Sequence, residues 1–170
     1  YASKKMKHFI TIIRPQQYIK NIFVLLPLFF VGEIANTNQL LNGLIAFVAF
    51  SLSASAIYIF NDYHDIKYDR KHPKKKHRPL AAGLINKNTA LLLMIILLII
   101  GLILMAYVSV NSLIFLIIYV FLNILYSLKL KRVALLDVTI IGVGFVLRLY
   151  TGSFAYDVSL KVWIVIMTFL

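Results

Sequence analysis

The chain of 170 residues contains no cysteine and very few acidic residues. Without cysteine it can form neither a disulfide framework nor a thiolate metal site. Only six Asp and Glu residues accompany eighteen Lys and Arg, which gives a formal net charge of +12. Charged residues make up 14% of the chain and apolar residues 61%, which is too apolar for a soluble domain of this length. The composition therefore indicates a membrane protein.

The positive charge is confined to short segments, which argues against a nucleic-acid-binding protein. Sixteen of the eighteen Lys and Arg residues fall within residues 4–20, 67–87 and 129–132, and these segments alternate with apolar runs. Such alternation is typical of proteins that cross a membrane several times. By the positive-inside rule, we expect a multi-pass protein of the cell (inner) membrane whose N-terminus and basic loops are cytoplasmic.

Five apolar runs are expected to cross the membrane as helices, and a sixth is incomplete. About twenty apolar residues span the hydrocarbon core. The second, third and fifth runs reach this length, whereas the first and fourth are expected to extend into flanking polar residues. With boundaries good to a few residues, the runs cover residues 18–32, 40–60, 90–110, 113–128 and 133–154, followed by the incomplete run from residue 160.

The ends of the chain suggest that it is the N-terminal portion of a longer protein. It starts at Tyr1 rather than at a methionine, and it stops at Leu170 inside an apolar run. A helix that stopped there would leave its last carbonyl groups unpaired in lipid. We therefore predict an all-α transmembrane bundle, one integral membrane domain over residues 1–170, with further helices after it.

Half of the acidic residues lie in one eight-residue stretch that follows the second apolar run. Asp62, Asp65 and Asp69 are spaced by three and four residues, which places them on one face of a continuing helix. Such a cluster at a membrane edge would repel itself unless a cation neutralised it. We predict a hard, oxygen-binding cation such as Mg²⁺, with Asn61 beside the three carboxylates. A solvated helix end is the alternative.

A polar stripe continues from these acids back into the second apolar run. Ser51, Ser55 and Tyr58 share with the aspartates a sector about 80° wide, at 100° of turn per residue. The opposite sector consists of Leu, Ile and Phe. The stripe is therefore predicted to line a cavity inside the bundle rather than to face lipid.

A basic loop follows the acidic stretch directly. Taken alone, such a loop attaches a protein to anionic lipid. Beside a metal-binding face, Arg70, Lys75 and Arg78 would instead bind phosphate, because Mg²⁺ with Arg and Lys holds a diphosphate and neutralises it as it departs. We therefore predict that residues 61–88 form a cytoplasmic acidic and basic active-site loop.

Two further groups of polar residues are candidates for the same site. In the fifth run, Arg148 is expected roughly 15–20 Å along the helix from its cytoplasmic end, and a mid-span arginine suggests a functional site. An ion pair with Asp137 is the alternative, but eleven residues correspond to about 16 Å of helix rise, too far for contact. At the first run, Lys20 and Asn21 either reach the same phosphates or anchor the helix at the interface.

The acidic stretch, Asn61-Asp62-x-x-Asp65-x-x-x-Asp69, resembles the first aspartate-rich motif of the UbiA superfamily of intramembrane prenyltransferases. Within this superfamily the chain resembles most the branch of decaprenyl-phosphate phosphoribosyltransferases. The resembling pieces cover residues 14–152 and are, in order, Arg14-Pro15-x-Gln17-x-x-Lys20-Asn21, Asp69-Arg70-x-His72-Pro73-x-Lys75, Arg78-Pro79-x-Ala81-x-Gly83, Tyr126-x-x-x-Leu130-Lys131, Asp137, and Gly144-Phe145-x-x-Arg148.

The resemblance implies an all-α bundle of nine helices, of which this chain would hold about five and a half. Relatives that prenylate aromatic compounds usually carry a second aspartate-rich motif. Here Asp137 stands alone, since Val133 and Ile141 occupy the positions four residues away on either side. This departure favours the phosphoribosyl branch, in which Tyr-x-x-x-Leu-Lys takes the place of the second motif.

The activity implied by the resemblance is Mg²⁺-dependent transfer of a 5-phosphoribosyl group from phosphoribosyl pyrophosphate to a polyprenyl phosphate of the decaprenyl type, with release of pyrophosphate. Such a reaction would belong to cell-envelope biosynthesis. A prenyl diphosphate transferase acting on an aromatic or other small acceptor is the alternative, and a non-catalytic membrane binder or transporter is the third hypothesis. No nucleic-acid partner is expected, and a homo-oligomer is left open.

The resemblance also implies roles for individual residues. The metal would be held by Asn61, Asp62, Asp65 and Asp69. Candidate catalytic residues are Asp62, Asp65, Tyr126, Lys131 and Asp137, of which Tyr126 and Asp137 would orient the ribose hydroxyls or a metal-bound water. Candidate substrate-binding residues are Arg14, Lys20, Asn21, Arg70, Lys75, Arg78 and Arg148.

Overall fold

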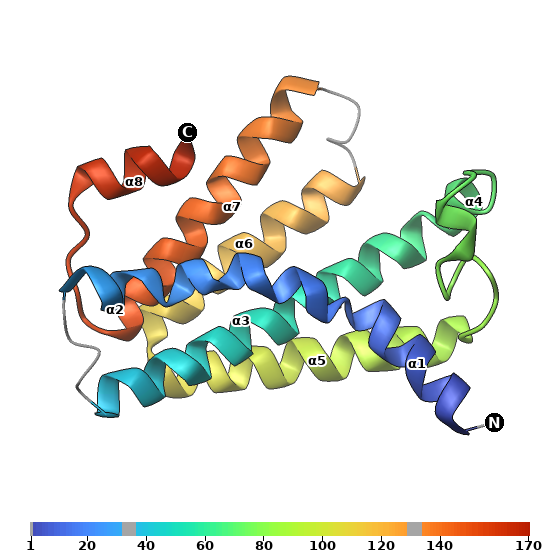
Figure 1. Ribbon diagram of the computed structural model, residues 1–170, viewed down its shortest axis with the longest axis horizontal. Coiled ribbons are helices and arrows are strands. Elements are labelled where there is room, and N and C mark those ends of the chain that lie inside the picture. Colours follow the sequence, from blue (N-terminus) through green and yellow to red (C-terminus); the bar gives the residue numbers. More distant parts are fainter. Residues whose placement is uncertain (1, 32–36, 129–133) are drawn as a thin grey trace.

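The computed structural model describes residues 2–31, 37–128 and 134–170 (Figure 1). Every regular element in these ranges is helical, which confirms the predicted all-α class. The helices are α1 (Ala2–Ile13), the 3₁₀ helix η1 (Pro15–Val24), α2 (Leu26–Val31), α3 (Thr37–His64), α4 (Ile66–Asp69), the 3₁₀ helix η3 (Lys75–His77), α5 (Lys87–Val108), α6 (Val110–Leu128), α7 (Ala134–Ala155) and α8 (Val162–Phe169).

Four helices in the described part of the chain are long and apolar enough to cross a membrane: α3, α5, α6 and α7. They correspond to the second to fifth apolar runs. A helix satisfies all its internal backbone hydrogen bonds within the segment, which is why uninterrupted apolar runs fold this way in lipid. The turn between α5 and α6 is tight, because Ser109 alone separates the two helices and is extended (φ −165°, ψ 134°).

The first apolar run differs from the prediction. Instead of one helix over residues 18–32, the chain forms the ten-residue 3₁₀ helix η1 and the six-residue α2, which meet at Leu25. Pro27 is the second residue of α2, where its missing N–H breaks no helical hydrogen bond. Neither piece has the length of a span, so the expectation of a first continuous membrane helix is wrong for residues 18–31.

The helices form two antiparallel pairs crossed by the N-terminal segment. Figure 1 shows α3 beside α5, α6 beside α7, and the path through α1, η1 and α2 running over them. The α3–α5 contact is close because Gly101 has no side chain: a Cβ there would lie 2.8 Å from the Ala49 carbonyl oxygen. Small residues that allow helix backbones to approach are a common device of membrane bundles.

Helix α5 exposes a continuous apolar surface. Leu92, Ile95, Ile99 and Ile103 are all exposed on it. In water such a patch would be a liability, whereas in a bilayer it lies against lipid tails. The outer face of α5 is therefore explained by a membrane setting.

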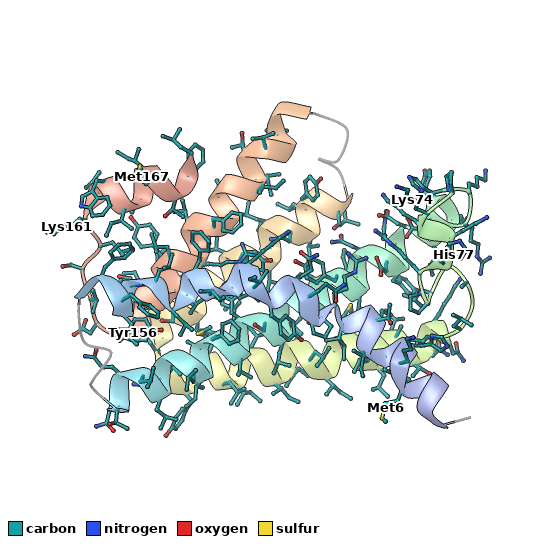
Figure 2. The ribbon with its side chains drawn as sticks, viewed as in Figure 1. Met6, Lys74, His77, Tyr156, Lys161 and Met167 are labelled. Carbon is teal, nitrogen blue, oxygen red and sulfur yellow. The ribbon has the colours of Figure 1, made fainter. Side chains whose placement is uncertain are left out.

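The connections gather at two ends of the molecule. In Figure 1 the end of α3, the start of α5, the end of α6 and the start of α7 lie toward one end, and the α5–α6 turn lies toward the other. This alternation is the one that the basic segments predicted. Figure 2 shows Lys74 and His77 on the loop at the first of these ends, beyond the helix ends.

Candidate functional site

The acidic residues lie at and just beyond the C-terminal end of helix α3, at the end of the bundle that carries the basic loop. It ends at His64, Asp65 forms a joint (φ −89°, ψ 3°), and α4 adds one further turn. The Asp65 N–H donates to the Asn61 carbonyl (3.0 Å) and the Asp69 N–H to the Asp65 carbonyl (2.8 Å), so the chain stays close to the helical path. The predicted continuous helix is thus interrupted only at Asp65.

Two arginines from other segments neutralise the carboxylates of Asp62 and Asp69. Arg14 Nη2 donates to Asp62 Oδ1 (2.5 Å), and Arg78 Nη1 donates both to Asp62 Oδ1 (3.0 Å) and to Asp69 Oδ2 (2.8 Å). Asp62 is only 2% exposed, and a carboxylate buried to that degree requires charged partners. We call these four residues the arginine–aspartate cluster.

The local backbone explains how both arginines reach one carboxylate. Arg14 lies between α1 and η1 in the left-handed conformation (φ 58°), which redirects the chain toward the end of α3. The basic loop brings Arg78 back to the end of α3. The loop is held there by Leu80, which is buried in the same apolar cluster as the end of α3. Arg70 helps to close this loop, since its Nε donates to the Ala81 carbonyl (3.0 Å), and Gly83 supplies the positive φ of 73°.

The four predicted metal ligands are only partly brought together. Asp62 and Asp69 share Arg78, whereas Asp65 Oδ1 lies 3.6 Å from His64 Nδ1. Asn61 Oδ1 is buried and has no hydrogen-bond partner among the residues that the structure describes. Within residues 2–31, 37–128 and 134–170, no three acidic or histidine side chains lie close enough to share one ion. The donor chemistry nevertheless fits Mg²⁺, because carboxylate and amide oxygens are its usual protein ligands.

The second half of the candidate site is centred on Arg148 of α7, which is 5% exposed. Its Nε donates to Asn21 Oδ1 (2.9 Å) and its Nη2 to the Tyr119 hydroxyl (3.1 Å). The rings of Phe50, Tyr119 and Phe145 lie 4.9–5.3 Å from its guanidinium carbon. A buried network therefore joins η1, α6 and α7 through this one side chain.

Arg148 and Lys20 line a cavity of about 200 Å³, which we call the Arg148 cavity. Phe145 and Gly144 of α7 form its apolar side. None of the described residues that line it is acidic. Its polar lining comes from Lys20, Tyr58, Tyr119, Asn123, Tyr126 and Arg148.

The polar stripe of α3 lines this cavity only through Tyr58. Ser51 Oγ accepts from Asn21 Nδ2 (3.0 Å), and Ser55 Oγ bonds to the Tyr18 hydroxyl (2.9 Å) and donates to the Ile13 carbonyl (2.8 Å). The two serines thus hold η1 against α3, and the prediction that they would line a cavity is wrong. The reason is that buried hydroxyls take protein partners where a neighbouring segment offers them.

The structure places the remaining predicted residues as follows. Tyr126 lies in the Arg148 cavity, whereas Lys75 is exposed in η3. Lys131 lies outside the described residues, and so does the side chain of Asp137. Sequence reasoning missed Tyr119 and Asn123, although they precede Tyr126 by seven and three residues, a spacing that would have placed all three on one face of α6.

These features define a class of protein, namely an integral membrane helix bundle with a polar, charged site at one end. Residues 22–170 match the model of the UbiA prenyltransferase family, and the chain belongs to this family. The resemblance carried by the sequence motifs is thereby confirmed.

Relatives in the family carry a specific name. The chain is 36% identical over 159 residues to a decaprenyl-phosphate phosphoribosyltransferase of Mycolicibacterium smegmatis, covering 91% of this chain and 50% of that protein. It is 35% identical over 159 residues to the enzyme of the same name from Corynebacterium glutamicum, covering 91% and 48%. The chain thus spans about half the length of these curated relatives.

Solved structures show the same fold. A structure of digeranylgeranylglyceryl phosphate synthase matches with a TM-score of 0.77 and 26% identity, covering 98% of this chain and 57% of that chain. A UbiA homologue from Archaeoglobus fulgidus, solved with GPP and Mg²⁺, matches with a TM-score of 0.75 and 20% identity over 95% of this chain and 58% of that one. The arrangement of helices is therefore that of a partial UbiA bundle.

Proposed function

We propose that the protein transfers a 5-phosphoribosyl group from phosphoribosyl pyrophosphate to a polyprenyl phosphate, with release of pyrophosphate, at the cytoplasmic face of the cell membrane. The observation that carries this proposal is the convergence of Arg14, Asp62, Asp69 and Arg78 at one helix end, beside a cavity lined by Lys20 and other polar groups. The names of the curated relatives support the choice of substrates.

The acidic residues would hold Mg²⁺ with the donor diphosphate. Asp62, Asp65 and Asp69 would supply the ligands, together with the amide oxygen of Asn61, which has no partner among the described residues. The metal, when bound, neutralises the diphosphate as it departs. Guanidinium groups bind carboxylate and phosphate with similar geometry, so arginines that now lie on the carboxylates are suitably placed to take diphosphate oxygens instead.

The reaction itself demands little acid–base chemistry from the protein. The bond from C1 of the ribose to the pyrophosphate oxygen breaks, and an oxygen of the lipid phosphate bonds to C1 from the opposite face. Because this nucleophile is already anionic, catalysis consists of positioning and charge stabilisation. Tyr126 and Asp137 would orient the ribose hydroxyls, and the phosphates would be shared among Lys20, Arg70, Lys75, Arg78 and Lys131.

The apolar part of the acceptor would lie beside the polar site. A groove of about 450 Å³, lined by residues such as Phe30 and Trp163, shares Ile141 and Phe145 with the Arg148 cavity. A polyprenyl chain in this groove would place its phosphate toward the polar residues. The same groove is the observation that favours the second candidate, a prenyl diphosphate transferase with a small acceptor.

A labelling experiment separates the two candidates. The full-length protein in native-like membranes is given Mg²⁺ and either radiolabelled phosphoribosyl pyrophosphate with decaprenyl phosphate, or radiolabelled prenyl diphosphate with an aromatic acid. We expect label in the lipid extract only in the first reaction, and none when EDTA replaces Mg²⁺. Label transferred only from the prenyl diphosphate would replace the proposal with the second candidate.

A further inference from the structure

The charge of Arg148 is buried without an acidic counterpart among the described residues. Its hydrogen-bond acceptors are the amide oxygen of Asn21 and the hydroxyl of Tyr119, which are both neutral. The three rings around it offer their electron-rich faces but no formal negative charge. An isolated cation at membrane depth is costly, and such residues mark functional sites.

One edge of the Arg148 guanidinium is left for a ligand. Nε and Nη2 are used within the protein, whereas Nη1 makes no hydrogen bond to any described residue. Gly144 keeps the space beside this nitrogen open, since a Cβ at that position would lie 3.3 Å from Nη1. The side chain is thus fixed by two neutral acceptors and presents its remaining donors to the cavity.

The Arg148 cavity is a neighbour of the arginine–aspartate cluster rather than a part of it. Tyr58 lines the cavity, and Asp62 follows Tyr58 by four residues on α3, about 6 Å of helix rise. Arg14 of the cluster contacts the same tyrosine, with its guanidinium carbon 5.3 Å from the ring centre. Tyr58 is therefore common to both groups, but among the described residues only the arginine–aspartate cluster contains carboxylates.

We propose that the Arg148 cavity is a second anion site, which binds a phosphate monoester without the help of a metal. Two cationic groups and several hydroxyl and amide groups line it, and none of the described lining residues is a carboxylate, which favours an anion over a metal–anion complex. At about 200 Å³ it lies below the roughly 300–1,000 Å³ of pockets that enclose drug-sized ligands, so it fits a headgroup and not a whole lipid.

The choice of a phosphate monoester rests on the proposed function. Both the polyprenyl phosphate acceptor and the 5-phosphate of the ribosyl donor are phosphate monoesters, and both are distinct from the diphosphate that the metal would bind. The binding experiment must therefore separate these two sources.

Binding is measured with the full-length protein in nanodiscs, in EDTA, by calorimetric titration. The probes are farnesyl phosphate, the neutral alcohol farnesol, ribose 5-phosphate and inorganic phosphate. Saturable binding of farnesyl phosphate, at least about tenfold tighter than that of farnesol, assigns the site to the lipid phosphate. Saturable binding of ribose 5-phosphate instead assigns it to the donor. If neither monoester binds without Mg²⁺, the proposal is overturned.

Three variants test whether the bound anion lies on these residues. Arg148→Gln removes the buried charge, and Lys20→Gln removes the exposed one without disturbing a packed side chain. Lys76→Gln is the matched control, because it removes an equal charge from the exposed basic loop. We expect monoester affinity to fall by about tenfold or more in Arg148→Gln and severalfold in Lys20→Gln, with no change in Lys76→Gln.

The outcomes remain separate from those of the labelling experiment. If Arg148→Gln does not fold, Lys20→Gln still decides, since wild-type affinity in that variant contradicts the proposal. Metal-free, Lys20-dependent binding without any transfer of label would leave the anion site standing and remove the proposed reaction. If label is transferred but neither substitution weakens monoester binding, the proposed reaction stands and the anion site is contradicted.

Discussion

At the scale of single residues, two buried charges are handled in opposite ways. Asp62 is neutralised by two guanidinium groups from distant segments, whereas Arg148 has only neutral acceptors and aromatic faces among the described residues. Burying a charge without a counter-ion is costly. The Asp62 charge is therefore balanced by protein groups in this structure, whereas the Arg148 charge would gain most from an added anion.

The Asp62→Asn substitution tests the acid at the centre of the arginine–aspartate cluster. Asparagine keeps the size of aspartate and one acceptor oxygen, but it removes the charge that would hold a metal. We expect phosphoribosyl transfer to fall at least about 100-fold, because several kcal/mol of charge stabilisation depend on the metal. Initial rates at saturating Mg²⁺ measure this, with circular dichroism to confirm that the variant is folded.

Asp157→Asn is the control for that substitution. Asp157 is exposed beyond the end of α7, and its left-handed conformation (φ 54°) is one that asparagine tolerates. It is expected to keep the wild-type rate. Wild-type transfer in Asp62→Asn would contradict the metal role of the acidic stretch.

The Tyr119→Phe substitution tests the hydroxyl that accepts from Arg148. Its loss leaves Nη2 of a buried guanidinium without this partner, and we expect the free energy of unfolding to fall by about 1 kcal/mol. Tyr107→Phe is the matched control, because Tyr107 is 79% exposed on α5. Reversible unfolding in mixed micelles measures both, and an equal effect in the two variants would show that the Arg148 contact contributes nothing.

At the scale of elements, the short helix η1 is the piece that organises the site. It carries Lys20 and Asn21, and Tyr18 and Asn21 bind it to the serines of α3. Its end also approaches α7 so closely that a Cβ at Gly152 would overlap the Val24 carbonyl group. The position of the cavity therefore depends on a backbone contact between η1 and α7.

Gly152→Ala should separate these two elements. A Cβ at Gly152 meets backbone atoms of Val24, which cannot move aside as a side chain can. We expect destabilisation of roughly 1–3 kcal/mol, as for other overpacking substitutions, together with weaker anion binding. Thermal unfolding and the metal-free titration measure the two effects.

Gly43→Ala provides the comparison. A Cβ at Gly43 meets mainly the side-chain end of Tyr156, which can rotate away, although its hydroxyl donates to the Val24 carbonyl (3.1 Å). A smaller loss of stability is expected, with anion binding retained. A greater loss of stability and anion binding in Gly43→Ala than in Gly152→Ala would contradict the idea that the backbone contact of η1 with α7 positions the cavity.

At the scale of the whole molecule, the described helices alternate between two ends, and the basic loop that carries Lys74 and His77 lies at one of them (Figures 1 and 2). By the positive-inside rule we expect that end to be cytoplasmic. The chain contains no cysteine, so single introduced cysteines can report on each end.

Cysteine labelling checks this orientation. In a background free of other cysteines, Lys76→Cys lies in the exposed basic loop and Asn111→Cys lies just after the α5–α6 turn. A membrane-impermeant maleimide added to intact cells is expected to label Asn111→Cys but not Lys76→Cys, and permeabilised cells should show both. The reverse pattern in intact cells would invert the topology.

Much of the fold could be read from the sequence, because span length and charge alternation are properties of consecutive residues. The apolar runs predicted α3, α5, α6 and α7 to within a few residues at most ends. The same reasoning failed at residues 18–31. Apolar content does not reveal that Tyr18 and Asn21 bond to α3 and that the run breaks at Leu25.

The sequence by itself determined that this is a multi-pass helical membrane protein with acids and bases gathered at one end, since hydropathy and charge act locally along the chain. Only the tertiary structure decided which charges meet. Arg14, Asp62 and Arg78 come together across 64 residues because a left-handed turn and a closed loop return them to one carboxylate. Arg148 is left without an acidic neighbour among the described residues because the elements packed around it offer only amide, hydroxyl and aromatic groups.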